Sequence, residues 1–342
     1  MGPLAPPAPD RSGYRSALRL LGRGTLVLLL LPAISWGCLA LSLDGPGRVA
    51  AVLYALASLV LLVRLRPWPR GWLAALGLFL LVLGGWLTIA PSNEREWLPD
   101  VRALPRMRLA GERLEVTNVR DFRYRSETDF EARWEERGYD LAQVTGLDLL
   151  VCDWGEKWIV HTILSWEFAD GRHLAISIET RKEVGEGYSA VRGFFRQFEL
   201  YYVVGDERDL VGVRTNVRGE RVRLYRLDVA PEVARALLRS YAARVEHLAV
   251  EPAWYNAMTQ NCTTSIRLHA AELGRAHPWD WRILINGKAE ELLYLRGQVD
   301  TSLPFAELRA RSDVTAAAQA AGDAPDFSAR IRAGLPPRPA AR

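Results

Sequence analysis

The sequence predicts an α+β protein: a small antiparallel sheet with helices packed on one side, preceded by three transmembrane helices. Three observations predict this class. Residues 25–90 are almost entirely apolar, whereas the rest of the 342-residue chain carries frequent charges. Residues 147–179 alternate as strands do, and residues 231–248 have a proline start, an acidic first turn and helical apolar spacing. About 250 residues follow the apolar block, enough to bury a substantial core.

Three apolar segments are expected to cross a membrane, at residues 25–43, 49–63 and 71–90. A spanning helix needs roughly 20 apolar residues, so the first and third qualify directly. The second is short and can span if Arg48 and Arg64 snorkel toward the headgroups. Arginines precede the first segment and separate the second from the third. The positive-inside rule then places residues 1–24 in the cytoplasm and everything after Ala90 in the periplasm of a bacterial inner membrane. With only two spans the large domain would be cytoplasmic.

The bulk charge and the cysteines exclude some classes of function. The net charge of +4 is mild, and no basic stripe interleaved with aromatic residues predicts a nucleic-acid partner. No Cys/His spacing suggests zinc, so we predict neither a metal nor another cofactor. Cys38 lies in an apolar run, as a packing residue does. Cys152 is either a buried thiol or a disulfide partner of Cys262, and the sequence leaves both open.

Residues 91–146 are expected to form a linker and the first part of the periplasmic domain, with a hairpin around Gly111 and a surface excursion over 121–139. A thiol-bearing core should follow over 147–322. Within it we expect strands at 147–154, 158–168, 173–179, 199–205 and 222–227, and helices at 188–197, 231–248 and 254–273. Residues 323–342 are rich in Ala, Pro and Arg and are expected to be poorly ordered.

The segment Asn261-Cys262-Thr263-Thr264 carries the predicted chemistry. Asn261 is a good N-cap, which places Cys262 at a helix N-terminus. There the macrodipole favours the nucleophilic thiolate, and the N–H groups of Cys262 and Asn261 can receive a developing oxyanion. The alternative is a buried structural cysteine, and spacing alone does not decide between the two.

A thiolate nucleophile needs an imidazole partner, and His161 is the candidate. Ala169-Asp-Gly171 predicts a three-residue hairpin loop that pairs Phe168 with Arg172. Counting back along that ladder puts His161 opposite Glu179, which can orient the imidazole as a third catalytic residue does. A two-residue Asp-Gly turn would shift the register and separate them. His173 is the rival third member, but it should lie nearer the turn.

Substrate contacts are predicted near the same hairpin. Arg181, Arg192 and Arg196 are candidates for binding a phosphate or carboxylate group, although such a charged run also occurs on solvated faces. Tyr255, at the start of the Cys262 segment, is predicted to bind substrate with them.

Three stretches carry a family resemblance: VHTILSWEFADGRHLAISIETRKE, YSAVRGFFRQFELYYVVGDERDL and WYNAMTQNCTTSI. Over roughly residues 95–335 the chain resembles the Lnb N-terminal periplasmic domain family. That family is similar to circularly permuted NlpC-type, papain-like folds, in which the His strand precedes the Asn-Cys helix. The resemblance implies a Cys/His thiol mechanism on Cys262 and His161 and, for the Lnb branch, acyl transfer to a lipoprotein N-terminus. Three helices precede the domain here, so the resemblance supports the reaction type better than the acceptor.

The sequence therefore predicts a membrane-anchored periplasmic thiol acyltransferase with inner-membrane lipids and lipoproteins as partners. Two alternatives stay open: a cysteine peptidase or amidase acting on peptidoglycan, and a non-catalytic envelope protein.

Overall fold

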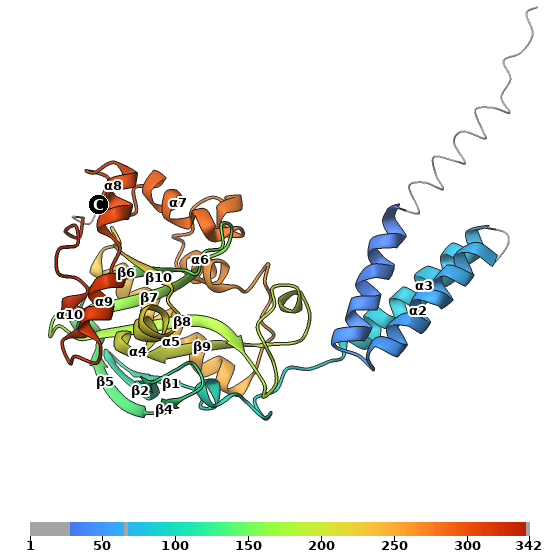
Figure 1. Ribbon diagram of the computed structural model, residues 1–342, viewed down its shortest axis with the longest axis horizontal. Coiled ribbons are helices and arrows are strands. Elements are labelled where there is room, and N and C mark those ends of the chain that lie inside the picture. The colour runs from blue at the N-terminus through green and yellow to red at the C-terminus, as the bar shows by residue number, and fades with distance from the viewer. Residues whose placement is uncertain (1–27, 65–67, 340–342) are drawn as a thin grey trace, which may run out of the picture. The chain divides into compact units, whose positions relative to one another are not determined.

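The computed structural model describes residues 28–64 and 68–339 (Figure 1). The chain divides into two compact units, Met1–Ala90 and Pro91–Arg342. The predicted cytoplasmic segment, residues 1–24, lies outside the described residues.

The first unit contains a helix at Leu28–Leu43, α2 (Arg48–Arg64) and α3 (Trp68–Leu87). The helices approach closely, because a Cβ at Gly37 would lie 2.7 Å from the Tyr54 hydroxyl. Trp86 Nε1 also donates a hydrogen bond to Asp44 Oδ2 at 2.6 Å. Among the described residues, one helical stretch, Pro69–Leu87, is long and apolar enough to cross a membrane. By length and composition the structure thus supports one of the three predicted spans.

The second unit is built on an eight-stranded sheet in the order β1-β2-β9-β8-β7-β6-β10, with β5 paired to β2. The strands are β1 (Arg106–Ala110), β2 (Arg113–Arg120), β5 (Trp134–Asp140), β6 (Val144–Asp153), β7 (His161–Phe168), β8 (His173–Arg181), β9 (Glu199–Gly205) and β10 (Arg221–Arg226). β2 meets β9 in parallel at Arg120 and Gly205, and the other pairs are antiparallel. The sheet is therefore larger than predicted, and it is mixed.

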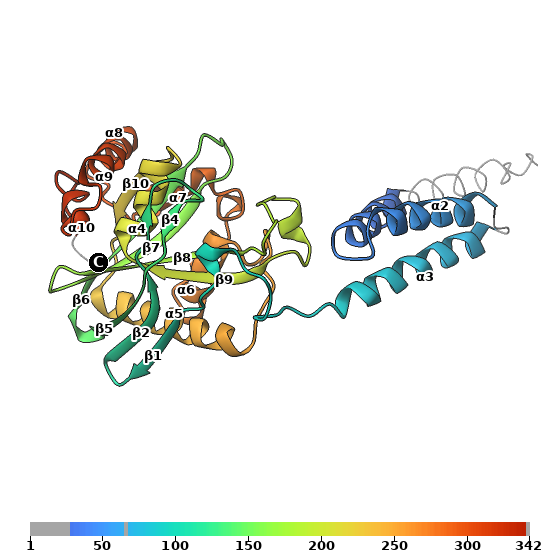
Figure 2. The ribbon, with the colours of Figure 1, turned by 60° about the horizontal axis from the view of Figure 1, so that its bottom comes forward.

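Helices cover both faces of the sheet (Figure 2). The prediction of helices on one side only was therefore wrong. One face carries α5 (Pro231–Val250) and α6 (Cys262–Glu272), and the other carries α4 (Glu207–Gly212), α9 (Thr315–Ala321) and α10 (Phe327–Arg330). The remaining helices are α7 (Ala289–Leu295) and α8 (Phe305–Arg311). β7 alternates accordingly: Leu164 and Trp166 belong to the core under α5, and Ile163 belongs to the opposite core.

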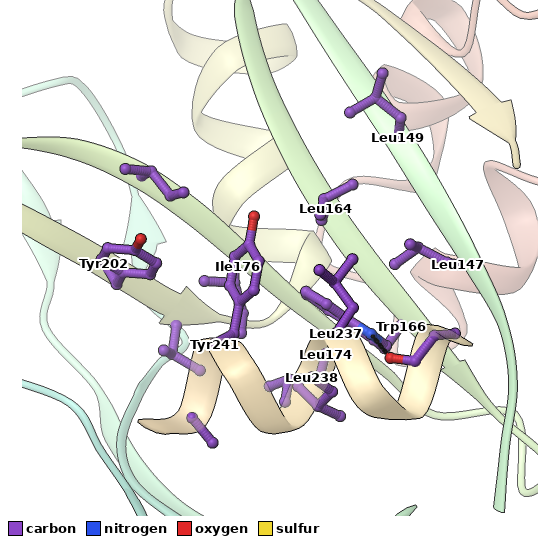
Figure 3. Packing of buried hydrophobic residues seen from close by; sticks show 14 of the residues in the cluster. Leu147, Leu149, Leu164, Trp166, Leu174, Ile176, Tyr202, Leu237, Leu238 and Tyr241 are labelled. Carbon is purple, nitrogen blue, oxygen red and sulfur yellow. Dashed lines mark hydrogen bonds between the residues drawn. The ribbon is translucent and has the colours of Figure 1, made fainter. Parts of the chain in front are cut away.

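Trp166 anchors α5 to the sheet (Figure 3). Its side chain is fully buried, and its Nε1 donates to the Ala234 carbonyl at 2.8 Å. The Tyr241 ring packs edge-on against it, with ring centroids 5.1 Å apart. The indole ring buries a large apolar surface, and its N–H donates a hydrogen bond. These two contacts together fix α5 relative to β7.

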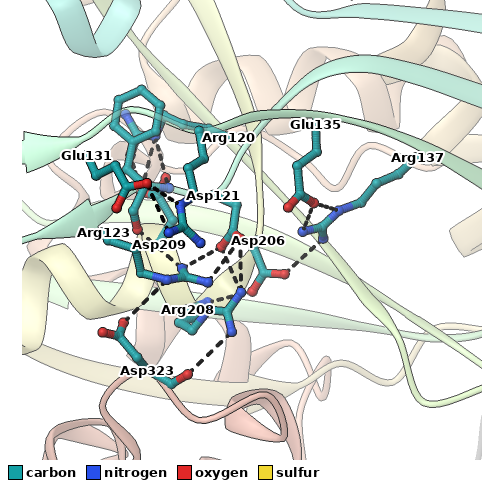
Figure 4. A network of polar contacts seen from close by, with 12 residues as sticks. Arg120, Asp121, Arg123, Glu131, Glu135, Arg137, Asp206, Arg208, Asp209 and Asp323 are labelled. Carbon is teal, nitrogen blue, oxygen red and sulfur yellow. Dashed lines mark hydrogen bonds and ion pairs between the residues drawn. The ribbon is translucent and has the colours of Figure 1, made fainter.

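Residues 121–139 are in part the surface excursion that the sequence predicted, since residues 127–129 and 131–133 are exposed, but they also form regular structure. They form β5 and the hairpin of β3 (Arg123–Tyr124) with β4 (Phe130–Glu131). An ion-pair network joins this region to α4 (Figure 4). Arg120 pairs with Asp209 at 2.9 Å with both side chains buried, and Asp121 pairs with Arg208 at 2.9 Å. The start of this region is thus tied to α4 by buried ion pairs, whereas Arg125, Asp129 and Arg133 stay exposed.

Two other segments also differ from the prediction. Residues 188–197 hold one 3₁₀ turn (η3, Arg192–Phe194) where a helix was predicted. The tail is packed over residues 323–339, where it was predicted to be poorly ordered; residues 340–342 lie outside the described range. Phe327 is buried there, and Arg332 pairs with Asp148 at 2.8 Å and Glu207 at 2.6 Å.

Candidate active site

Cys262 is the first residue of α6, and Asn261 caps that helix. The Asn261 side-chain oxygen accepts the backbone N–H groups of Thr263 at 3.0 Å and Thr264 at 2.8 Å. In return, the Thr264 hydroxyl accepts the N–H of Asn261 at 2.9 Å. This capping box fixes the first turn of α6. It holds the thiol, which is buried, at the end of the helix where the macrodipole favours a negative charge.

His161 is the first residue of β7, and the hairpin that follows has the register predicted from its loop. Phe168 donates its N–H to the Arg172 carbonyl at 3.0 Å, and Gly171 has a φ of +82°. The ladder then runs from Glu167 opposite His173 to Ile163 opposite Ser177. Because strand side chains alternate, His161, Ser177 and Glu179 share one face at the open end of this ladder.

Ser177 lies between His161 and Glu179. Its Oγ is 2.6 Å from His161 Nε2, and it donates to Glu179 Oε1 at 2.7 Å. Glu179 Oε1 is itself 3.6 Å from His161 Nε2. Since Nε2 faces Ser177 and Glu179, Nδ1 is the ring nitrogen left for the thiol.

The Cys262 thiol and the His161 imidazole influence one another, and the pKa of each is shifted. Burial raises the pKa of Cys262, but the hydrogen bond and charge of His161, with the Thr162 hydroxyl and N–H, outweigh it and lower the pKa to about 6. Burial lowers the pKa of His161, but hydrogen bonds to Cys262 and Glu179 outweigh it and raise the pKa to about 9. Between these values the arrangement favours a thiolate–imidazolium pair, the nucleophilic form of a cysteine.

Arg214 completes the charge arrangement. It lies in a π-helical turn (η4, Val213–Val217) and donates to Glu179 Oε1 at 2.8 Å. Burial raises the pKa of Glu179, but the hydrogen bond with His161 and the charge of Arg214 hold it well below its usual value. Glu179 therefore remains an anion beside the imidazolium. Sequence reasoning missed Ser177, which the predicted register would have revealed, and Arg214, for which no sequence signal exists.

Asn286 is a third residue that the sequence did not reveal. Its side-chain oxygen accepts the Val160 N–H at 3.0 Å, and its Nδ2 donates to the Val160 carbonyl at 2.8 Å. The same Nδ2 lies 2.7 Å from Thr263 Oγ1 and 3.6 Å from Cys262 Sγ. Asn286 therefore ties the residue before His161 to the first turn of α6, which keeps imidazole and thiol together.

The predicted oxyanion donors need one correction. The Asn261 N–H is committed to Thr264 Oγ1 by the capping box, so it cannot receive a substrate oxygen. The N–H of Cys262 has no hydrogen-bond acceptor among the described residues. The first turn of α6 thus offers one backbone donor beside the sulfur where two were expected.

The other predicted site residues lie elsewhere. His173, the rival third member, contacts Gly171 at the turn, with its Nδ1 3.1 Å from that carbonyl, and is at the far end of β8 from Glu179. Arg181 is buried: it donates to the carbonyls of Val101 at 3.0 Å and Arg102 at 2.7 Å and stacks on Trp97 at 4.1 Å. It is therefore a structural residue, because its donors and its charged face are already engaged.

Arg192 and Arg196 lie near η3, and neither is among the described residues that line the cavity at Cys262. Tyr255 does line that cavity. Cys152 and Cys262 are both free thiols, so the disulfide left open by the sequence is not formed. Cys152 is instead a buried core residue opposite His161 on the β6–β7 ladder.

A cavity of about 940 Å³ opens beside the Cys262–His161 pair. Its walls include aromatic and aliphatic side chains, among them Trp158, Phe194 and Ile178, and its polar groups include Glu179 and Arg214. A cavity of this size, lined by apolar side chains together with charged groups such as Glu127, Lys182 and Arg218, is typical of a binding site for an organic ligand with apolar and polar parts.

The region that holds this site matches a known protein family. Residues 130–287, which contain His161, Glu179, Cys262 and Asn286, match the Lnb N-terminal periplasmic domain family. The match is narrower than the resemblance predicted from the sequence. No curated protein and no solved structure is detectably similar to the chain. The description of this family implies a periplasmic location for residues 130–287, the part of the chain that it matches.

Proposed function

We propose that this protein is a membrane-anchored periplasmic acyltransferase that carries its acyl group on Cys262. The observation that carries the proposal is that Cys262 and His161 line the same largely apolar cavity, with Asn286 joining Val160 to Cys262. A thiolate beside an imidazolium is suited to attack on an acyl carbonyl. The apolar walls favour an acyl chain over the polar glycan and peptide of peptidoglycan.

In the first half of the reaction, the Cys262 thiolate attacks the ester carbonyl of a phospholipid or lipoprotein donor. A carbon–sulfur bond forms, and the Cys262 N–H at the start of α6 stabilises the developing oxyanion. The ester carbon–oxygen bond then breaks, and the leaving alkoxide takes the proton of the His161 imidazolium. The products of this step are a thioester on Cys262, an alcohol and a neutral imidazole.

In the second half, an amine attacks the thioester. Neutral His161 accepts the proton that the amine loses, the carbon–sulfur bond breaks, and the thiolate–imidazolium pair is restored. Glu179, held ionised by Arg214, stabilises the imidazolium in both halves. The N-terminal amine of a lipoprotein is the proposed acceptor, and a permuted NlpC-type, papain-like relationship would account for the order of His161 and Cys262.

The membrane arrangement is part of the same proposal. Three spans, at residues 25–43, 49–63 and 71–90, would place the catalytic unit in the periplasm, and Pro69–Leu87 supports the last of them. A bilayer anchor fits an enzyme whose donor lies in the bilayer.

The test is acyl transfer to a diacylated lipoprotein by the full chain in phospholipid vesicles. Cys262→Ser should abolish transfer, whereas Cys38→Ser, the matched control in the first unit, should retain it. Transfer by Cys262→Ser at the wild-type rate would reject the proposal.

A further inference from the structure

The mouth of the Cys262 cavity carries an unusual set of exposed apolar side chains. Six of them, here called the apolar rim, both line the cavity and expose 41–54 % of their surface: Trp154, Trp158, Tyr188, Phe194, Met258 and Ile285. They come from four separate segments, between β6 and β7, between β8 and β9, before α6 and before α7. Large apolar side chains gathered around one cavity mouth and left exposed on a folded domain mark an interaction site.

The composition of the apolar rim fits a lipid interface. Trp and Tyr prefer the headgroup level of a bilayer, where an amphipathic ring has both an apolar and a wet side. Lysines lie at this cavity: Lys157 lies over the Trp158 ring at 5.0 Å, and Lys182 lines the cavity. Lys288, near Ile285 in the chain, lies 4.0 Å from Glu291. The charges of Lys157 and Lys182 complement anionic headgroups, and their long stems can lie along apolar surface.

The chain enters this unit at the end of the sheet that carries the cavity. β7 begins, β8 ends and β9 begins at the end that carries His161 and Glu179. The segment that enters the unit is bound there, because Ser92 donates to Glu199 Oε1 at 3.1 Å and Leu98 donates to the Lys182 carbonyl at 2.9 Å.

We propose that the apolar rim docks on the bilayer surface, so that an acyl chain passes from the lipid into the cavity without crossing water. The proposal rests on the proposed function for its substrate, but it assigns a surface and a partner, the phospholipid bilayer, that the catalytic residues do not specify. A docked rim would also exclude water from the thioester, which would otherwise hydrolyse.

Photochemical labelling tests the docking directly. The full chain, reconstituted in vesicles of phosphatidylethanolamine and phosphatidylglycerol, would carry p-benzoylphenylalanine in place of Trp158. The matched control carries it in place of Ala329, which is exposed on α10. Nearby Arg338 binds Glu167, close to the end of β7 farthest from the cavity. Both variants are made in wild-type and Cys262→Ser backgrounds, so the outcome does not depend on catalysis.

Illumination should add the mass of a phospholipid to the peptide containing position 158 and not to the peptide containing position 329. Equal rates of acyl transfer in Cys262→Ser and wild type would reject the proposed function. If the lipid adducts still form at position 158 in Cys262→Ser, the docking proposal holds in that case too. Lipid adducts at neither position, equal adducts at both, or a cross-linked dimer through position 158 would each overturn the proposal.

Discussion

Replacing His161 with alanine is expected to raise the pKa of the Cys262 thiol from about 6 to 9.0, its ordinary value, or above. The substitution removes the hydrogen bond and the positive charge that favour the thiolate. The burial of the sulfur, which opposes ionisation, remains. The direction of the change therefore follows from the contacts of the two side chains.

The size of the effect depends on what is measured. Moving the pKa from about 6 to 9.0 lowers the thiolate fraction at pH 7 by about a hundredfold. A more basic thiolate is also a better nucleophile. With a Brønsted coefficient of about 0.45, the rise in pKa increases the rate constant of the thiolate about 20-fold. The rate of alkylation at pH 7 should thus fall only about fivefold. The midpoint of the pH profile, which moves by three units or more, is the informative quantity.

The assay is the rate of iodoacetamide alkylation of the full chain as a function of pH. Mass spectrometry of the Cys262 peptide separates its reaction from those of Cys38 and Cys152. His173→Ala is the matched control, because that histidine was the rival catalytic candidate and contacts the turn instead. The control should keep the wild-type midpoint. An unchanged midpoint in His161→Ala would refute the reasoning.

Three further predictions follow from the same contacts. The rate of acyl transfer should depend on pH as a bell-shaped curve, rising near pH 6 as Cys262 ionises and falling near pH 9 as His161 loses its proton. Glu179→Gln should move the upper limb of the kcat/KM profile to lower pH, because Glu179 raises the pKa of His161. Asn286→Ala should cost about 1–3 kcal/mol for each Val160 group left unsatisfied, measured by denaturant unfolding in detergent, whereas the exposed Lys288→Ala should cost little. Trp166→Ala should cost about 3–5 kcal/mol in the same measurement, and a loss below 1 kcal/mol would contradict the packing of α5 described above.

The parts of the site that the sequence predicted are those fixed by local chemistry. The loop Ala169–Gly171 sets the register of β7 and β8, because Gly171 supplies the left-handed conformation that a three-residue hairpin needs. The start of α6 was equally local, since Asn261 and Thr264 cap the helix that carries Cys262. The pairing of His161 with Cys262, which are far apart in the chain, followed from chemical need and from the family resemblance.

The parts that sequence reasoning missed depend on long-range packing. Asn286 lies 126 residues from Val160, and no periodicity marks such a contact. Arg181 stands in a charged run that suggested a solvated face, but the chain near Val101 covers it and takes up its donors. The second layer of helices was missed for the same reason, because α9 and α10 come from a segment whose Ala- and Pro-rich composition suggested disorder.

The central claim is that Cys262 itself becomes acylated. Its most direct test is mass spectrometry of the Cys262 peptide after the full chain has been incubated with phospholipid vesicles and no amine acceptor. We expect the added mass of a fatty acyl group that hydroxylamine removes. A Cys262 peptide that stays unmodified, in a preparation that still transfers acyl chains once the acceptor is added, would contradict it.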